Sequence, residues 1–197
     1  FYGWVMVVAF LIVATTLSGI QLTFGVFFKS IEGEFNLTRA ATSAILSTNV
    51  LLAGVLAFLL GLALDKYGPR KIVLFMGIFT GLSLLLTSQT TAQWQLFITY
   101  GLLLSIGTGA VYVVPMSTVS RWFDRKRGLA LGITGAGLGL GIVVIAPLAT
   151  YLISNFDWRV AYMVIGLIAW VIVIPLSRLL RRDPYEIGAL PDGVDLD

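Results

Sequence analysis

Long apolar segments separated by short polar ones run through most of the chain. Each segment is long enough for an α-helix to cross a bilayer, which takes roughly 20 residues. None shows the strict apolar–polar alternation that is typical of membrane barrel strands. The expected fold class is therefore an all-α membrane protein, with short connections that favour antiparallel neighbours. The predicted spans are at about 4–28, 42–64, 71–88, 95–120, 128–153 and 159–179.

The composition agrees with this pattern and narrows the chemistry. The chain is 58% hydrophobic and only 12% charged, whereas a typical soluble domain carries about 25% charged residues. Histidine and cysteine are both absent, which excludes disulfides, thiolate chemistry and imidazole metal ligands. Because paired acidic residues are also missing from the apolar segments, we expect neither an enzyme nor a metal or cofactor site.

The basic residues are distributed unequally between the two ends of the predicted helices. Ten of the 13 follow the second, fourth or sixth span, and three lie at the other end. The positive-inside rule then predicts that both ends of this segment are cytoplasmic, in a cell inner (plasma) membrane. The polar, acidic stretch 181–197 is expected to be a cytoplasmic linker that leads to further chain. The ten residues are Lys66, Arg70, Lys71, Arg121, Arg125, Lys126, Arg127, Arg178, Arg181 and Arg182; the three are Lys29, Arg39 and Arg159.

Neutral polar side chains within the apolar segments are the candidates for a ligand path. Ser105, Thr108 and Tyr112 have the spacing i, i+3, i+7 and share one helix face. Serine and threonine in such helices commonly bond their own backbone, whereas a phenol in the membrane interior needs a partner or a wet cavity. Gln21 supplies a further polar group in the first span. The many glycines of 128–153 permit either static close packing or sliding of helices, and the sequence does not decide between them.

A short charged turn, Gly61–Lys71, separates the second and third spans. Gly68 can adopt a positive φ and Pro69 fixes the next φ, so the two favour a compact turn. The stretch is either a basic loop that sets topology or a gate; an acidic residue and two glycines favour the gate. The candidate gating residues are Gly61, Asp65, Lys66, Gly68, Arg70 and Lys71.

These residues match the pattern G-x-x-x-D-[RK]-x-G-x-[RK]-[RK], and the turn resembles the loop 2–3 signature of the major facilitator superfamily. The resemblance implies a transporter of two six-helix halves, each built from 3+3 inverted repeats. Residues 1–180 would be the N-terminal six-helix bundle, and 181–197 the start of the central loop. It also implies that Asp65 engages the C-terminal half and that Arg70 holds Asp65 in place.

Other segments resemble the monocarboxylate transporters within that superfamily. The family as a whole is resembled by Phe27–Phe35 and by Trp122–Gly137, continuing to Leu148. Its bacterial branch, which includes oxalate:formate antiporters, is resembled by Asp157–Arg159 and Tyr185–Gly193.

This second resemblance implies a small carboxylate as substrate, a proton as co-substrate, and an arginine supplied by the C-terminal half. Leu22 stands where the animal transporters have a proton-coupling lysine. Leu138, between two glycines, is an expected apolar contact for the substrate. The lipid bilayer is the surrounding partner, and no nucleic-acid partner is expected. The predicted substrate-binding residues are Tyr112, Leu22, Gln21, Leu138, Ser105 and Thr108.

Proton-coupled symport of a monocarboxylate such as lactate or pyruvate is the function that these features favour. Exchange of anions, as in an oxalate:formate antiporter, is an alternative. A six-helix membrane scaffold or channel is the alternative outside secondary transport.

Overall fold

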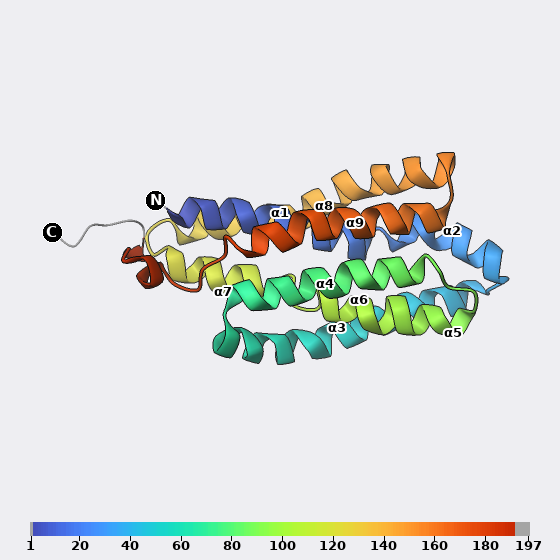
Figure 1. Cartoon of the computed structure of the whole chain (residues 1–197), viewed down its shortest axis with the longest axis horizontal. Coiled ribbons are helices and arrows are strands. Elements are labelled where there is room, and N and C mark those ends of the chain that lie inside the picture. Colours follow the sequence, from blue (N-terminus) through green and yellow to red (C-terminus); the bar gives the residue numbers. More distant parts are fainter. Residues whose placement is uncertain (1, 192–197) are drawn as a thin grey trace.

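The computed structural model describes residues 2–191, and within that range every regular element is helical (Figure 1). Six stretches are long and apolar enough to cross a membrane, which confirms the predicted six-span, all-α architecture. We number them span 1 to span 6 in chain order. They are Tyr2–Phe35, Arg39–Tyr67, Pro69–Thr87, Gln93–Trp122, Arg127–Asn155 and Trp158–Ser177.

Spans 1 and 4 are each divided into several helices. Span 1 consists of α1 (Tyr2–Leu22) and α2 (Phe24–Phe35), and span 4 of α5 (Gln93–Leu96), the π-helix η1 (Phe97–Leu103), α6 (Leu104–Thr108) and α7 (Val113–Trp122). The remaining spans are the single helices α3 (Arg39–Tyr67), α4 (Pro69–Thr87), α8 (Arg127–Asn155) and α9 (Trp158–Ser177). The short 3₁₀ helix η2 (Pro184–Ile187) follows α9.

Helix α2 extends beyond the expected end of span 1 near residue 28. Its buried residues Phe24, Phe27 and Ile31 continue one helix face into a polar stretch. The helix ends where Asn36 adopts a left-handed conformation and its N–H bonds the Glu32 carbonyl. Hydropathy therefore located the end of the apolar run, whereas amphipathic packing sets the end of the helix.

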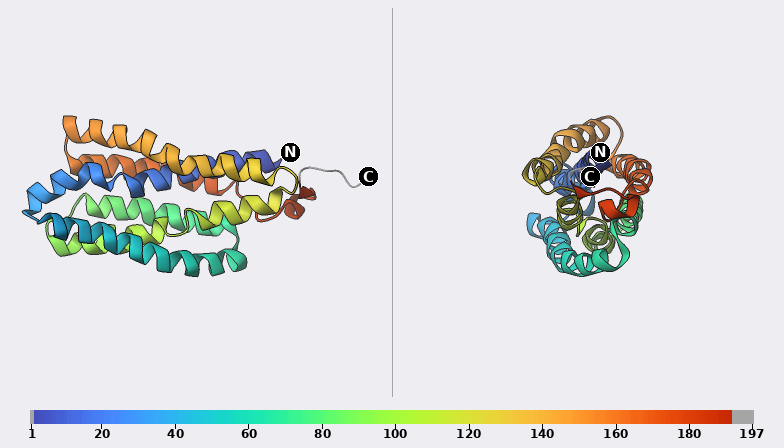
Figure 2. Two further views of the ribbon diagram at one scale, coloured as in Figure 1. Left: turned by 180° about the vertical axis from the view of Figure 1, so that it is seen from behind. Right: turned by 90° about the vertical axis from the view of Figure 1, so that its left-hand side faces the viewer.

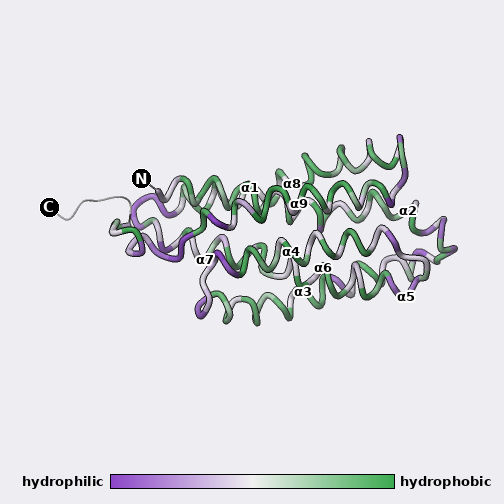
Figure 3. Tube along the Cα trace, viewed as in Figure 1, coloured by the Kyte–Doolittle hydropathy of each residue, from purple (hydrophilic) through white to green (hydrophobic). Residues whose placement is uncertain are grey.

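The two ends of the bundle differ in charge. Figure 1 shows the N-terminus, the α3–α4 and α7–α8 turns and the segment after α9 at one end, which we call the basic end. The α2–α3, α4–α5 and α8–α9 connections lie at the opposite end. Figure 3 shows hydrophilic residues concentrated at these ends and apolar residues between them. The ten-to-three division of basic residues thus coincides with the two ends of one bundle.

The helix contacts follow the symmetry that inverted three-helix repeats require. Such repeats relate spans 1, 2 and 3 to spans 4, 5 and 6. A contact between spans 1 and 5 then implies one between spans 4 and 2. Both occur, as α1 with α8 and as α3 with η1 and α6, and spans 3 and 6 pack together as α4 with α9. The arrangement fits the predicted 3+3 organisation.

Glycines allow the closest of these contacts. A Cβ added to Gly141 of α8 would lie 2.5 Å from the backbone nitrogen of Gly19 on α1. Since no Cβ can be accommodated at that distance, the two backbones touch directly.

Spans 2 and 5 bury the smallest share of their apolar residues. The end-on view in Figure 2 shows α3 and α8 at two edges of the bundle. They leave large apolar side chains exposed, among them Val50, Leu51, Val55, Phe58, Leu140, Val143, Val144 and Tyr151.

Candidate functional site

A hollow of about 220 Å³ lies where spans 1, 2 and 4 meet. It is smaller than the roughly 300–1,000 Å³ of pockets for drug-sized ligands, so it suits a molecule of a few heavy atoms. Three of the predicted substrate-binding residues, Gln21, Thr108 and Tyr112, line it together. The remaining lining residues are Val50, Ala53, Gly54, Ala57 and Gly109.

An interruption of span 4 places Tyr112 at this hollow. Residues 109–112 form a turn between α6 and α7, and Tyr112 is the last residue before α7 begins. Pro115 explains the interruption, because a proline cannot donate a backbone hydrogen bond and its ring collides with the carbonyl of Val111, four residues earlier. The Tyr112 side chain remains 51% exposed. A phenol is therefore presented to the hollow instead of being packed within the bundle.

The other polar residues on the predicted face bond their own helix. The Ser105 hydroxyl donates to the Leu102 carbonyl at 2.6 Å, and that of Thr108 donates to the Leu104 carbonyl at 2.9 Å. Ser105 is fully buried and does not line the hollow. The hydroxyl of Thr108 is committed to its helix, so Tyr112 and Gln21 carry the polar side-chain atoms available there.

Two of the predicted substrate-binding residues, both leucines, lie away from the hollow. Leu22 is 48% exposed at the end of α1. Leu138 of α8 packs against the core cluster that contains Met6 and Phe10, and its carbonyl accepts a hydrogen bond from Ser18 at 3.1 Å. Neither residue is among those that line the hollow.

Asn49, a wholly buried residue of α3, was not among the predicted site residues. Its Nδ2 donates to the Tyr100 carbonyl at 3.1 Å. Its Oδ1 lies 3.5 Å from Gln21 Nε2, a weak contact that is longer than the usual N–H···O distance of about 2.7–3.2 Å. Asn49 thereby connects spans 1, 2 and 4 next to the hollow. A lone amide within the apolar run 42–64 was the signal that could have identified it.

The turn expected over Gly61–Lys71 is shorter than predicted, because α3 continues to Tyr67 and α4 begins at Pro69, and its ion pair differs as well. Gly68 has φ 78°, which favours glycine, and Pro69 opens α4. Arg121, in the last turn of α7, donates to Asp65 at 2.7 Å. The sequence analysis assigned this role to Arg70; Arg70 is exposed, and among the described residues it is Arg121 that pairs with Asp65. The arginine from span 4 was missed because such pairing depends on the packing of distant segments.

Arg121 also lies near the segment that follows α9. Its Nη1 is 4.0 Å from an oxygen of Asp183. The same guanidinium therefore connects the end of α3 with the first residues of the expected central loop. This segment is described to residue 191, so the predicted motif residues Asp192 and Gly193 lie outside the described residues.

A shallow depression of about 370 Å³ lies beside Asp65, and Gly61 forms part of it. A Cβ added to Gly61 would meet only Val113, at an ordinary 3.5 Å. Gly61 therefore does not permit a close helix contact within this bundle; its bare face borders open space. Of the other predicted gating residues, Lys66 lies over the ring of Tyr67, 5.3 Å from its centroid, and Lys71 is exposed in the first turn of α4.

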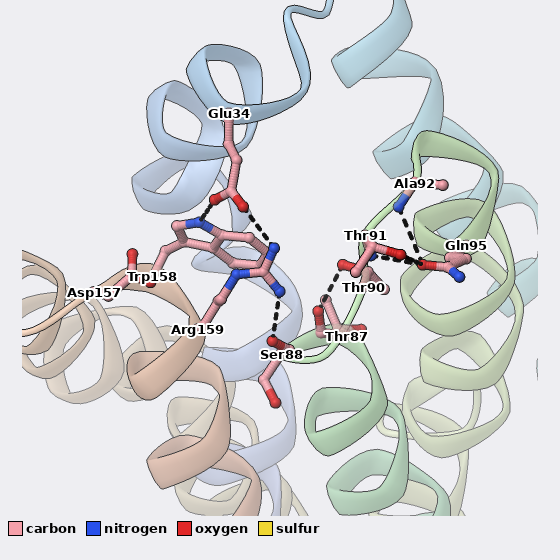
Figure 4. A network of polar contacts seen from close by, with 10 residues as sticks. All are labelled: Glu34, Thr87, Ser88, Thr90, Thr91, Ala92, Gln95, Asp157, Trp158 and Arg159. Atoms are coloured by element: carbon pink, nitrogen blue, oxygen red, sulfur yellow. Dashed lines mark hydrogen bonds and ion pairs between the residues drawn. The ribbon is translucent and has the colours of Figure 1, made fainter.

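A second charged network joins spans 1, 3 and 6 at the opposite end (Figure 4). Arg159 pairs with Glu34 of α2 at 2.5 Å and donates to the Ser88 carbonyl at 2.9 Å. The indole N–H of Trp158 donates to the same carboxylate. Asp157 caps α9 by accepting from the Trp158 backbone N–H at 2.7 Å. This network holds the extended part of α2 against α9.

The arrangement of potential metal ligands in residues 2–191 does not indicate a metal centre. Among residues 2–191 no three His, Cys, Asp or Glu side chains are grouped so that they could hold an ion.

Comparisons with known proteins agree with this architecture. The sequence profile of the Major Facilitator Superfamily matches residues 4–195. The chain is 31% identical over 194 residues to monocarboxylate transporter 13 of Bos taurus, covering 95% of this chain and 45% of that protein. It is 30% identical over 190 residues to the oxalate:formate antiporter of Oxalobacter formigenes, covering 94% of this chain and 44% of that protein.

Monocarboxylate transporter 14 of Mus musculus is 27% identical over 192 residues, which cover 98% of this chain and 38% of that protein. The chain thus spans less than half the length of these curated relatives. With its six spans, its repeat-like helix contacts and a profile match over nearly all residues, the chain belongs to the major facilitator superfamily.

Proposed function

We propose that the chain is the N-terminal six-helix half of a transporter that carries small carboxylates by alternating access. Residues 1–180 would form the transmembrane half and 181–197 the start of a cytoplasmic central loop. The observation that carries the proposal is the hollow at Gln21 and Tyr112, because it is small, partly polar and located where spans 1, 2 and 4 meet. In the superfamily the substrate site lies between the two halves near the bilayer midplane.

The hollow would bind an anion through neutral donors. Tyr112 offers an O–H and Gln21 an N–H, and both can donate to a carboxylate oxygen. Within residues 2–191, no Asp, Glu, Lys or Arg lines the hollow. The counter-charge would therefore come from an arginine of the C-terminal half, as the resemblance to monocarboxylate transporters implies. Leu22 and Leu138 would contact the alkyl part of the substrate from positions further along the path, with Ser105 supporting the helix behind it.

The C-terminal half would dock on the apolar surfaces of α3 and α8. These helices keep large apolar side chains exposed along their length. The depression beside Gly61 and Asp65 would receive part of that half when the basic end is closed. Lys66, Gly68, Arg70 and Lys71 would complete this gate, and the basic end would face the cytoplasm of a cell inner membrane.

Proton-coupled symport is the mode that we propose, with exchange of the oxalate:formate type as the second candidate. The similarity to monocarboxylate transporters favours the first, and the similarity to the Oxalobacter protein favours the second. Since Leu22 offers no titratable group, the proton route of a symporter would lie in the C-terminal half.

Transport by the full-length protein in proteoliposomes tests the proposal. We expect saturable uptake of L-lactate or pyruvate, driven by an inwardly directed proton gradient with no anion inside. Uptake that requires oxalate or formate inside the vesicles would support the exchanger instead. Absence of saturable uptake for all four anions would contradict both modes and favour a scaffold or channel.

A further inference from the structure

We infer that Asn49 is a positioning residue of the substrate site, which orients the side-chain amide of Gln21 toward the ligand. The inference rests on the proposed function, because it assigns a role to Gln21 in binding a carboxylate. It adds a residue that does not itself line the hollow and that makes its contribution through Gln21.

The orientation of the Asn49 amide is determined by its partner on span 4. The Tyr100 backbone carbonyl can only accept a hydrogen bond, so the atom of Asn49 that faces it must be the donor Nδ2. The other end of the planar amide, the acceptor Oδ1, then faces span 1. Reversing the amide would bring two oxygens together and leave a buried donor unpaired, which is costly.

The π-helical geometry of span 4 makes the Tyr100 carbonyl available. In an α-helix the N–H of Leu104 would bond to the carbonyl of Tyr100, four residues earlier. In this chain the Leu104 N–H bonds instead to Thr99, five residues earlier. The Tyr100 carbonyl is thus released from its usual partner and accepts from Asn49 of α3.

The same logic extends to Gln21. Because Asn49 presents an oxygen, the atom of Gln21 that faces it must be Nε2, which donates one of its two N–H groups. In the described part of the chain the Gln21 side chain makes no second hydrogen bond, so the other N–H of Nε2 is available to a ligand in the hollow. A carboxylate held between this N–H and the Tyr112 hydroxyl would find two donors. Without Asn49 the Gln21 amide could rotate and present its oxygen, which would repel the anion.

A double-mutant cycle in the full-length protein separates this role from a merely structural one. The probe is radiolabelled L-lactate, and the readouts are the KM and Vmax of uptake into proteoliposomes. We expect Gln21→Leu and Asn49→Leu each to raise KM by about five- to tenfold with Vmax little changed, which corresponds to the loss of one hydrogen bond. Since both substitutions act through one contact, the KM of the double variant should be no higher than that of Gln21→Leu alone.

Two further variants complete the design. Thr42→Val removes another wholly buried polar group of α3, whose hydroxyl donates to the Thr38 carbonyl of its own helix at 3.2 Å. It should leave KM unchanged. Asn49→Ser is too short to reach both partners, and should raise KM like Asn49→Leu; it replaces the leucine variant if that protein fails to reach the membrane.

The outcomes distinguish this inference from the proposed function. Should wild-type protein show no saturable uptake of any of the four anions, or Gln21→Leu leave KM unchanged, the proposed function of the hollow is wrong. If Gln21→Leu raises KM but the Asn49 variants do not, only the positioning role fails. Independent effects that multiply in the double variant would likewise overturn it, because they would show that Asn49 acts without Gln21.

Discussion

The guanidinium of Arg121 lies 2.7 Å from the carboxylate of Asp65, so the end of α3 is tied to span 4 and not to the neighbouring α4. The Asp65 side chain is 64% exposed, and pairs of this kind contribute only about 0–1 kcal/mol. Such a contact can therefore open and re-form during a transport cycle. The pair lies beside the depression at Gly61, which is the place that the proposed gate requires.

We predict that Asp65→Asn and Arg121→Gln shift the transporter toward the state that is open to the cytoplasm. Loss of an exposed ion pair should change the ratio of the cytoplasm-open to the cytoplasm-closed state by about two- to fivefold. The described chain has no cysteine to interfere, so single cysteines introduced at the basic end of the hollow can report the change through their alkylation rate. The matched control is Arg127→Gln, which removes an exposed positive charge at the start of α8, at the same end of the bundle. An equal rise in the control would show that net charge, not the Asp65–Arg121 pair, is responsible.

Substitution of Tyr112 by phenylalanine should weaken substrate binding while leaving the fold intact. The change removes only the hydroxyl, and the ring at this position is half exposed. We expect a roughly fivefold higher KM for L-lactate, as is typical for one lost hydrogen bond, and an unchanged melting temperature in detergent. Tyr185→Phe, on the exposed helix η2, serves as the control and should alter neither quantity. A KM that stays at the wild-type value in Tyr112→Phe would remove this phenol from the site.

Alanine at Gly141 should destabilise the contact between α1 and α8. The added methyl would lie 2.5 Å from the Gly19 nitrogen, so the two helices must separate. We expect a loss of about 1–3 kcal/mol, which overpacking of this kind commonly costs, measured as a lower melting temperature. Gly139→Ala is matched in helix and chemistry, but its Cβ would meet no atom within 4 Å. Similar losses in both variants would mean that helix flexibility, not close approach, is the reason for glycine at position 141.

Removal of Arg159 should loosen the attachment of α2 at the opposite end. Arg159→Gln loses the ion pair with Glu34 and weakens the bond to the Ser88 carbonyl. Because the groups are partly exposed, we expect a modest loss of about 1 kcal/mol in thermal stability. Arg39→Gln removes an exposed arginine near the same end and should have no effect. In a cycle with Glu34→Gln, additive losses would contradict direct pairing.

The sequence predicted the six spans and the concentration of basic residues at one end, because both depend on local hydropathy and charge. It also placed Gly68 in a turn that requires a positive φ, since that need is local to the Gly-Pro pair. Three features could not be predicted in this way. They are the pairing of Asp65 with Arg121, the bond from Asn49 to Tyr100, and the network of Glu34 with Arg159.

Each of these three contacts joins residues that lie more than 50 positions apart. Which residues meet depends on how whole helices pack, and hydropathy contains no information about partners. Three of the six predicted substrate-binding residues, Gln21, Thr108 and Tyr112, line the hollow. Ser105 satisfies its hydroxyl within its own helix, as is common for serine in apolar helices.

Because span 4 is divided into several helices, part of it can move without disturbing the contact of α1 with α8. The π-helix 97–103 and the turn 109–112 interrupt the regular ladder on both sides of α6. Rotation of a few backbone dihedrals there changes the position of Tyr112, yet it breaks few α-helical hydrogen bonds. The glycine-lined contact of α1 with α8 lies elsewhere in the bundle and need not be disturbed. The hydroxyl of Tyr112, at the hollow, can thus be displaced by a local movement of span 4.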